Sequence, residues 1–199
     1  MYQVSNYYIM PISFDLDELR QRYDCKVYLE TGMWDPRGEV SLRKALRCSF
    51  DKVYCIELRD DWVALGNQVF NEDVQCNRLR IIHDDSVNLY KHIGSNPDFS
   101  QRSMFFLDAH VDNSNIQNYQ KKCPLFDELE AIKQISRNDN IIMVDDLRII
   151  TQPFPWGETI YGNIDFLKVI KEKILEINPE YKFMYLDGQI PNDVLLAYI

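Results

Sequence analysis

Acidic residues recur along this 199-residue sequence where apolar, β-rich segments give way to polar ones. A single carboxylate after a strand is ordinary, because Asp and Glu are good helix caps. Carboxylates at five consecutive strand ends are more than capping needs, and in a parallel sheet such ends meet at one edge. The residues are Glu30, Thr31 and Gly32 after the first segment, Glu57 after the second, Asp84, Asp85 and Ser86 after the third, Asp108 and His110 after the fourth, and Asp145, Asp146 and Arg148 after the fifth.

Three of these residues, Asp108, Asp145 and Asp146, form one acidic group if the fourth and fifth segments are neighbouring strands. Three carboxylates at close range repel one another unless a positive charge lies between them. A site with only oxygen ligands favours Mg²⁺, Mn²⁺ or Ca²⁺, and such a cation can lower the pKa of a bound hydroxyl. We therefore expect a divalent cation here. The alternative is that Asp145 or Asp146 only caps the turn that follows it.

His110 lies two residues beyond Asp108, beside the expected acidic group. The pKa of histidine is near neutrality, so its imidazole can accept the proton of an attacking hydroxyl. We expect His110, helped by Asp108, to be catalytic; the alternative is a structural or surface histidine. Of the other two histidines, His83 is expected to be structural or to lie near a bound base, and His92 to face solvent.

Glu57 closes the segment "KVYCIEL" and is placed to accept hydrogen bonds from the two hydroxyls of a ribose. The turn after the first strand indicates which nucleoside is bound. A pyrophosphate needs a glycine-rich turn with bare N–H groups, whereas "GMWDPRG" fills this one. Its neighbours Glu30 and Asp35 would repel phosphates but tolerate a sulfonium cation and an α-amino group. The turn therefore predicts a nucleoside without phosphates, S-adenosylmethionine.

Weaker candidates lie near the same edge. Arg148 is expected to pair with the acidic group or with a phosphate on an acceptor. Glu128 and Glu130 lie on one amphipathic segment, and one of them is expected to face solvent.

Apolar segments with strand character alternate with segments of helical periodicity along the chain. This alternation predicts an α/β fold: a doubly wound, Rossmann-like sheet of seven strands with helices on both faces. It is mostly parallel with an antiparallel last strand, and its order reverses beside the first strand. Residues 1–25 are expected to be an N-terminal extension of a domain over 26–199. Strands are expected over 26–31, 52–58, 78–85, 103–110, 140–146, 181–187 and 193–199, and helices over 15–22, 40–48, 60–71, 86–94, 124–136 and 163–177.

The net charge, the cysteines and the lengths of the apolar runs exclude some partners and cellular locations. The net charge of −9 and the pI near 4.8 argue against non-specific nucleic-acid binding, which needs a basic surface. The five cysteines are odd in number and lack C-x-x-C spacing, which indicates buried, reduced thiols in a reducing compartment. The N-terminus does not read as a signal peptide, and no apolar run approaches the ~20 residues of a membrane span. We therefore expect a cytoplasmic protein without a membrane partner.

The order and spacing of these motifs resemble the class I S-adenosylmethionine-dependent methyltransferases over about residues 26–199. "ETG", with Gly38 as a second glycine, resembles the first motif of that family, "IEL" the second, and "HDDS" the third. "FFLDAH", "CPLFDELEAI" and "IIMVDDLR" are similar to segments of small, metal-dependent sugar O-methyltransferases of the macrocin type. Two departures stand out: the first motif lacks Gly-x-Gly, and Asp84 replaces the usual glycine of the third.

The resemblance implies O-methyl transfer from S-adenosylmethionine to a small-molecule or glycan acceptor, most simply a sugar hydroxyl, with help from Mg²⁺ or Mn²⁺. It implies carboxylate ligands at the strand ends, here Asp108, Asp145 and Asp146. The residues expected to bind the methyl donor are Glu30, Thr31, Gly32, Ser41, Glu57, Asp85, Ser86 and Asp108.

Two other functions stay open from the sequence. One is a nucleotide-dependent oxidoreductase, which the absence of pyrophosphate-binding glycines disfavours. The other is a non-catalytic nucleoside-binding module of a larger glycan-synthesis polypeptide. The acceptor would be selected by residues 1–25, 111–122 and 149–163. Their sequences identify neither the acceptor nor the hydroxyl that is methylated, and the oligomeric state is equally open.

Overall fold

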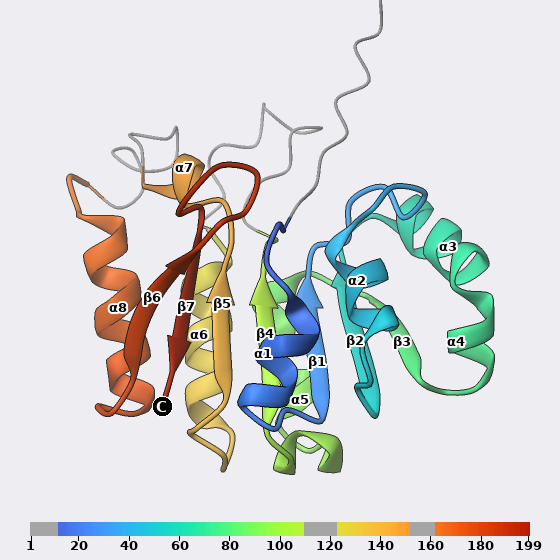
Figure 1. The fold of residues 1–199 in the computed structure, drawn as a ribbon, viewed down its shortest axis with the longest axis horizontal. Helices are drawn as coiled ribbons and strands as arrows, with labels where there is room; N and C mark the ends of the chain where they lie inside the picture. The colour runs from blue at the N-terminus through green and yellow to red at the C-terminus, as the bar shows by residue number, and fades with distance from the viewer. Residues whose placement is uncertain (1–11, 110–122, 152–161) are drawn as a thin grey trace, which may run out of the picture.

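The computed structural model describes residues 12–109, 123–151 and 162–199, which are coloured in Figure 1. Seven strands form one sheet in the order β3-β2-β1-β4-β5-β7-β6. The first five strands are parallel, and β7 runs antiparallel to both β5 and β6. The predicted fold class is confirmed. The strands are β1 Val27–Thr31, β2 Lys52–Glu57, β3 Leu79–His83, β4 Ser103–Leu107, β5 Ile141–Val144, β6 Lys182–Leu186 and β7 Val194–Tyr198.

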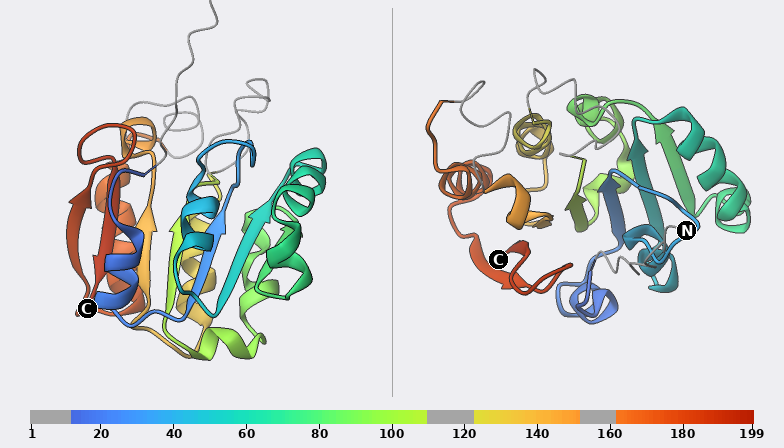
Figure 2. Two further views of the ribbon diagram at one scale, coloured as in Figure 1. Left: turned by 45° about the vertical axis from the view of Figure 1, so that its right-hand side comes forward. Right: turned by 90° about the horizontal axis from the view of Figure 1, so that it is seen from above.

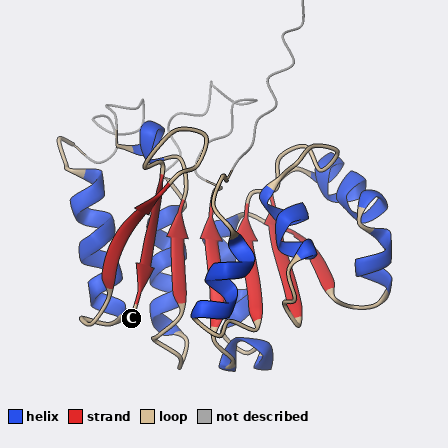
Figure 3. Ribbon diagram, viewed as in Figure 1, coloured by secondary structure: helices blue, strands red, loops and turns tan. Residues whose placement is uncertain are grey.

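Helices cover both faces of this sheet (Figures 2 and 3). Seen from above, α1 and α2 lie on one side of the strands, and α5, α6 and α8 lie on the other. The helices are α1 Leu16–Arg22, α2 Ser41–Arg47, α3 Asp60–Val69, α4 Asn71–Gln75, α5 Leu89–Ile93, α6 Leu125–Gln134, α7 Leu147–Ile150 and α8 Phe166–Ile177, with short 3-10 turns η1 Ser86–Asn88 and η2 Pro97–Ser100.

Two apolar cores, one on each face, explain why the central strands are almost continuously hydrophobic. Successive side chains of β1 alternate between them: Leu29 packs in the core beneath α6, and Tyr28 in the core beneath α1 and α2. Helix α6 contributes Leu125, Leu129 and Ile132 to its core, at the spacing of one helical face. Strand ends anchored from both faces provide a fixed edge for functional side chains.

The carboxyl ends of the central strands lie level at that edge. Thr31 of β1 pairs with Leu107 of β4, which pairs with Val144 of β5. Asp108 and Asp145, the residues that follow β4 and β5, therefore lie side by side at the same edge of the sheet. The order reverses at β1, which has β2 on one side and β4 on the other, as the sequence predicted.

Helix α1 belongs to the core of the sheet. The carboxylate of Asp15 caps it by accepting from the backbone N–H groups of Asp17 and Glu18, at 2.9 and 3.0 Å. Leu16 and Leu19 are buried in the same core as Tyr28. Residues 12–25 thus pack on the domain that the sequence places at 26–199.

Several elements differ from the expected ones. The helix expected over 60–71 breaks at Phe70, where φ is −108° and ψ is 28°, and α4 follows as a separate element. The helix expected over 86–94 begins as the turn η1, because the side chain of Asp85 accepts from Val87 N at 3.2 Å. Neither α7 nor η2 was predicted.

The cysteines agree with the expectation at four positions of five. Cys25, Cys48, Cys55 and Cys123 are buried free thiols, whereas Cys76 is exposed because it closes the surface helix α4. Among residues 12–109, 123–151 and 162–199, no helix is both long and apolar enough to cross a bilayer.

Candidate active site

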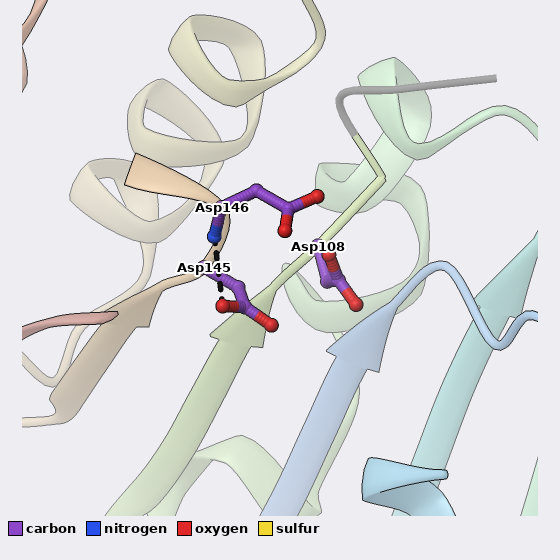
Figure 4. Close-up of side chains that lie close together, drawn as sticks. All are labelled: Asp108, Asp145 and Asp146. Carbon is purple, nitrogen blue, oxygen red and sulfur yellow. Dashed lines mark hydrogen bonds between the residues drawn. The ribbon is translucent and has the colours of Figure 1, made fainter. Parts of the chain in front are cut away.

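Asp108, Asp145 and Asp146 converge at the carboxyl ends of β4 and β5 (Figure 4). Each offers a carboxylate oxygen, and these atoms lie within 4.8 Å of one another. Asp146 adopts a left-handed conformation, with φ 57° and ψ 34°, which Asp tolerates better than most residues. Its backbone N–H donates to Asp145 Oδ1 at 2.7 Å. The predicted grouping of the three carboxylates is confirmed; their binding of a metal remains a prediction.

Burial and mutual repulsion disfavour ionisation of two carboxyl groups in the acidic group. Burial raises the pKa of Asp108 well above its usual range, and repulsion from Asp145 and Asp146 adds to this. The pKa of Asp145 is raised in the same way, by burial first and then by Asp146. Such carboxyl groups ionise fully only when a cation offsets their repulsion.

Arg148 supplies one positive charge beside this group. Its Nη1 lies 2.6 Å from Asp146 Oδ1, and it also pairs with the buried carboxylate of Asp193. Asp193 Oδ1 accepts in addition from Arg148 N at 3.0 Å. Arg148 therefore pairs with the acidic group, one of its two predicted roles. The sequence analysis missed Asp193, whose only signal was an acidic residue directly before the last apolar strand.

Glu30 lies fully buried at the end of β1. One oxygen accepts from the hydroxyl of Tyr28 at 3.0 Å, whereas Oε1 has no hydrogen-bond partner in the part of the chain that the structure describes. Burial raises the pKa of Glu30 to about 8, against the opposing effect of Ser41, Tyr28 and Cys55. Ser41, the buried first residue of α2, faces the same carboxyl. The unpartnered oxygen suits a cationic group such as the α-amino group of S-adenosylmethionine.

Glu57 is also buried, but both of its oxygens are in use. Oε2 accepts from Met33 N and Oε1 from Arg59 N, each at 2.8 Å. The carboxylate thus ties the turn after β1 to the start of α3. Each oxygen has two lone pairs, so the predicted pairing with ribose hydroxyls is compatible with these bonds. The ribose role of Glu57 remains a prediction, and the sequence analysis missed its structural role.

Gly32 brings the turn after β1 against Asp108. Its φ is 80°, and a Cβ at this position would lie 2.7 Å from the carbonyl oxygen of Asp108, so only glycine fits. In the same turn Asp35 pairs with Arg37 at 2.5 Å. The charge of Asp35 is therefore largely compensated, and Glu30 is left as the main source of the repulsion expected for a phosphate.

Asp84 organises the turn after β3. One oxygen accepts from Asp85 N and the other pairs with His92 Nε2, both at 2.8 Å. The prediction that His92 faces solvent was wrong, because Asp84 holds its side chain, which is only 19% exposed. Ser86 follows as the buried first residue of η1. His83 has a structural contact, with Nε2 lying 3.0 Å from Leu58 O.

Three further candidates have different outcomes. His110 lies outside the described residues. Glu130 is exposed and Glu128 is fully buried, so one of the two faces solvent, as predicted. The buried Glu128 lies beside Thr31 and Ser86, two of the residues expected from the sequence to bind the donor.

Comparison with known proteins gives a clear result for the fold. No family model matches the sequence, and no curated protein matches it. An O-methyltransferase from Bacillus cereus, solved with SAH, matches 92% of this chain and 78% of its own with 16% identity and a TM-score of 0.58. The O-methyltransferase TomG from Streptomyces achromogenes, solved with SAM, matches 92% of this chain and 77% of its own with 15% identity and a TM-score of 0.54.

A methyltransferase from Geobacter sulfurreducens matches 94% of this chain and 80% of its own, with 14% identity and a TM-score of 0.54. This chain shares the fold of these methyltransferases. At such low identity the similarity concerns the backbone fold alone. The reaction must therefore be argued from the residues at the carboxyl ends of the parallel strands, which we call the carboxyl edge.

Proposed function

We propose that this protein is an S-adenosylmethionine-dependent O-methyltransferase that methylates a sugar hydroxyl with the help of Mg²⁺ or Mn²⁺. The observation that carries the proposal is the convergence of Asp108, Asp145 and Asp146 directly beside the turn at Gly32. The proposed donor and metal sites are therefore adjacent, as a methyl transfer between them requires. The shared fold, whose relatives include structures solved with SAM and SAH, supports it.

The donor would lie over the ends of the first three strands. Glu57 would accept hydrogen bonds from the ribose, and Glu30 would face the α-amino group. Thr31, Gly32 and Ser41 would surround the methionyl part, with Asp108 at its border. Asp85 and Ser86 would contact the adenine. S-Adenosylmethionine, when bound, supplies an electrophilic methyl group on a sulfonium centre.

A divalent cation would be held by Asp108, Asp145 and Asp146. The donor set fits, because it consists of hard carboxylate oxygens at close range whose mutual repulsion a cation relieves. When bound, the cation supplies Lewis-acid chemistry that lowers the pKa of an acceptor hydroxyl. A sugar suits this site because its vicinal hydroxyls offer two oxygen ligands. Arg148 would offset the charge that remains.

The chain's own residues then perform two tasks. The carboxyl edge holds the acceptor oxygen in line with the methyl group, which is the main requirement of a displacement reaction. His110, two residues beyond Asp108 in the sequence, would accept the acceptor's proton on an imidazole nitrogen, and a carboxylate such as Asp108 would stabilise the imidazolium. The methyl carbon forms its new bond to oxygen as its bond to sulfur breaks, which leaves S-adenosylhomocysteine.

Two measurements test this function together. Isothermal titration should show micromolar binding of S-adenosylhomocysteine and no comparable binding of NAD⁺ or NADP⁺. A radiolabelled methyl donor should label members of a panel of sugars and nucleotide sugars in Mn²⁺ or Mg²⁺, and labelling should stop in EDTA. Binding of NAD(P)⁺ without S-adenosylhomocysteine would point to an oxidoreductase. Donor binding without labelling of any acceptor would favour a non-catalytic nucleoside-binding module.

A further inference from the structure

Glu128 is a buried acid that the proposed reaction does not use. It lies in the first turn of α6, where its side chain is 0% exposed, and neither carboxyl oxygen makes a hydrogen bond of good geometry to any residue that the structure describes. A buried polar group without a partner costs about 1–3 kcal/mol, and a charged one costs more. Such a group needs an explanation in a helix whose other buried residues are apolar.

The surroundings of Glu128 connect it to the proposed donor site. The hydroxyls of Thr31 and Ser86 face its carboxyl, and both residues are themselves buried. Thr31 ends β1, and Ser86 opens η1 in the turn after β3. Helix α6 packs against η1, and Thr31 faces Glu128 from the end of β1, so Glu128 lies where α6 meets two segments of the proposed donor site.

The charge environment favours the neutral acid. Burial raises the pKa of Glu128 to about 7, the two hydroxyls oppose this, and the nearby carboxylates of Asp85 and Asp127 reinforce it. The thiol of Cys123, close to the same group, is neutral because burial raises its pKa to about 12. No cation of the described residues is among the main causes of the raised pKa of Glu128. Ionisation near neutral pH would therefore leave a buried charge without compensation.

We propose that Glu128 is a positioning residue for the donor site: its neutral carboxyl hydrogen-bonds Thr31 and Ser86 and so holds the end of β1 and the turn η1 against α6. The inference rests on the proposed function, because it assigns these two residues to donor binding. Ionised Glu128 would draw in water to solvate its charge and would loosen both contacts. Donor affinity is therefore high when Glu128 is protonated and falls as pH rises through about 7.

The test is the pH dependence of S-adenosylhomocysteine binding, measured by isothermal titration between pH 6 and 8.5. Affinity of the wild-type protein should include a component that weakens by roughly threefold or more across this range. Glu128→Gln keeps a neutral group that donates and accepts hydrogen bonds, so it should retain the affinity seen at pH 6 and lose that component. Glu128→Ala should bind weakly at every pH.

The control is Glu130→Gln, which removes a carboxylate from the same helix at an exposed position and should keep the wild-type profile. Comparing each variant with the wild type cancels the titration of Glu30 and of other donor-site groups. Thermal unfolding confirms that each variant is folded.

The outcomes separate the inference from the function on which it rests. If S-adenosylhomocysteine binds none of the proteins at any pH, the proposed function fails. If it binds the wild type and Glu128→Gln with the same pH profile, the proposed function survives and the inference is overturned. Weak binding to a folded Glu128→Gln at every pH would also overturn it, since the neutral form would then be insufficient.

Discussion

The two halves of the carboxyl edge use acidic residues in opposite ways. On the side of β2 and β3, the carboxylates of Glu57, Asp84 and Asp85 accept backbone N–H groups and shape the turns that would surround a donor. On the side of β4 and β5, Asp108 and Asp145 lie close together with raised pKa values. Within the described residues, the carboxylates of the first half are satisfied by backbone N–H groups, whereas Arg148 is the one positive charge paired with the acidic group of the second half. That contrast supports the proposal that the nucleoside binds in the first half and the cation in the second.

Removing the acidic group should have the largest effect. Asp145→Asn combined with Asp146→Asn should lower turnover by about 10³-fold or more, because Lewis-acid stabilisation is worth several kcal/mol. Affinity for S-adenosylhomocysteine should change little, since the donor is proposed to bind in the other half. Asp60→Asn with Asp61→Asn, a matched pair of exposed acids at the start of α3, should keep activity. Full turnover of wild-type protein in EDTA would contradict the cation's role.

The proton acceptor comes next. His110→Ala should lower turnover by about 10²-fold or more while binding of donor and acceptor survives, as is typical for loss of a general base. The wild-type rate should rise with pH through one ionisation near neutrality, and the variant should lose that step. An unchanged pH–rate profile in His110→Ala would instead assign this histidine to holding the acceptor.

A smaller effect is expected in the donor half. Glu57→Gln should weaken binding of S-adenosylhomocysteine by at least tenfold, because a charged-group hydrogen bond contributes about 1.5–3 kcal/mol and the new amide cannot accept at both positions. The control is Asp35→Asn, in the same turn but paired with Arg37, which should bind within twofold of the wild type. Unaltered affinity of a folded Glu57→Gln protein would place the nucleoside elsewhere.

Repulsion within the acidic group should also lower the melting temperature of the metal-free protein by a few degrees. A carboxyl whose folded pKa is raised binds more protons in the native state, so stability falls as pH rises from its unfolded value, near 4, through the folded one. In EDTA at neutral pH, Asp145→Asn should therefore have a Tm higher than the wild type by about 2–4 °C for each kcal/mol of repulsion removed. Scanning calorimetry measures this, and a lower Tm would show that Asp145 stabilises the fold.

The sequence predicted the frame of this molecule well, because its signals are local and strong. Apolar runs such as "VYCI" identify strands buried on both faces, and the strand ends then locate the acidic group. Contacts between residues far apart in sequence carry no such signal. Asp193 meets Arg148 across 45 residues. His92 was assigned to solvent because helical spacing does not reveal that Asp84 lies within reach.

The same limit applies to the roles of individual acids. Glu128 and Glu130 have the same chemistry in the sequence, yet one is enclosed by η1 and β1 and the other is exposed. Glu57 was expected to meet only a ribose, since the turn that delivers Met33 N to its carboxylate depends on the three-dimensional path after Gly32.

The central claim is that the β4–β5 half of the edge is built for a divalent cation, and titration with Mn²⁺ tests it most directly. Isothermal titration of metal-free protein should show one Mn²⁺ site, with affinity that increases as pH rises because Asp108 and Asp145 must lose their protons to bind. Asp145→Asn with Asp146→Asn should abolish that site, and Asp60→Asn with Asp61→Asn should leave it intact. If the wild type and the Asp145/Asp146 variant bind Mn²⁺ equally, or if neither binds it, Arg148 is the only compensating charge required and the claim is wrong.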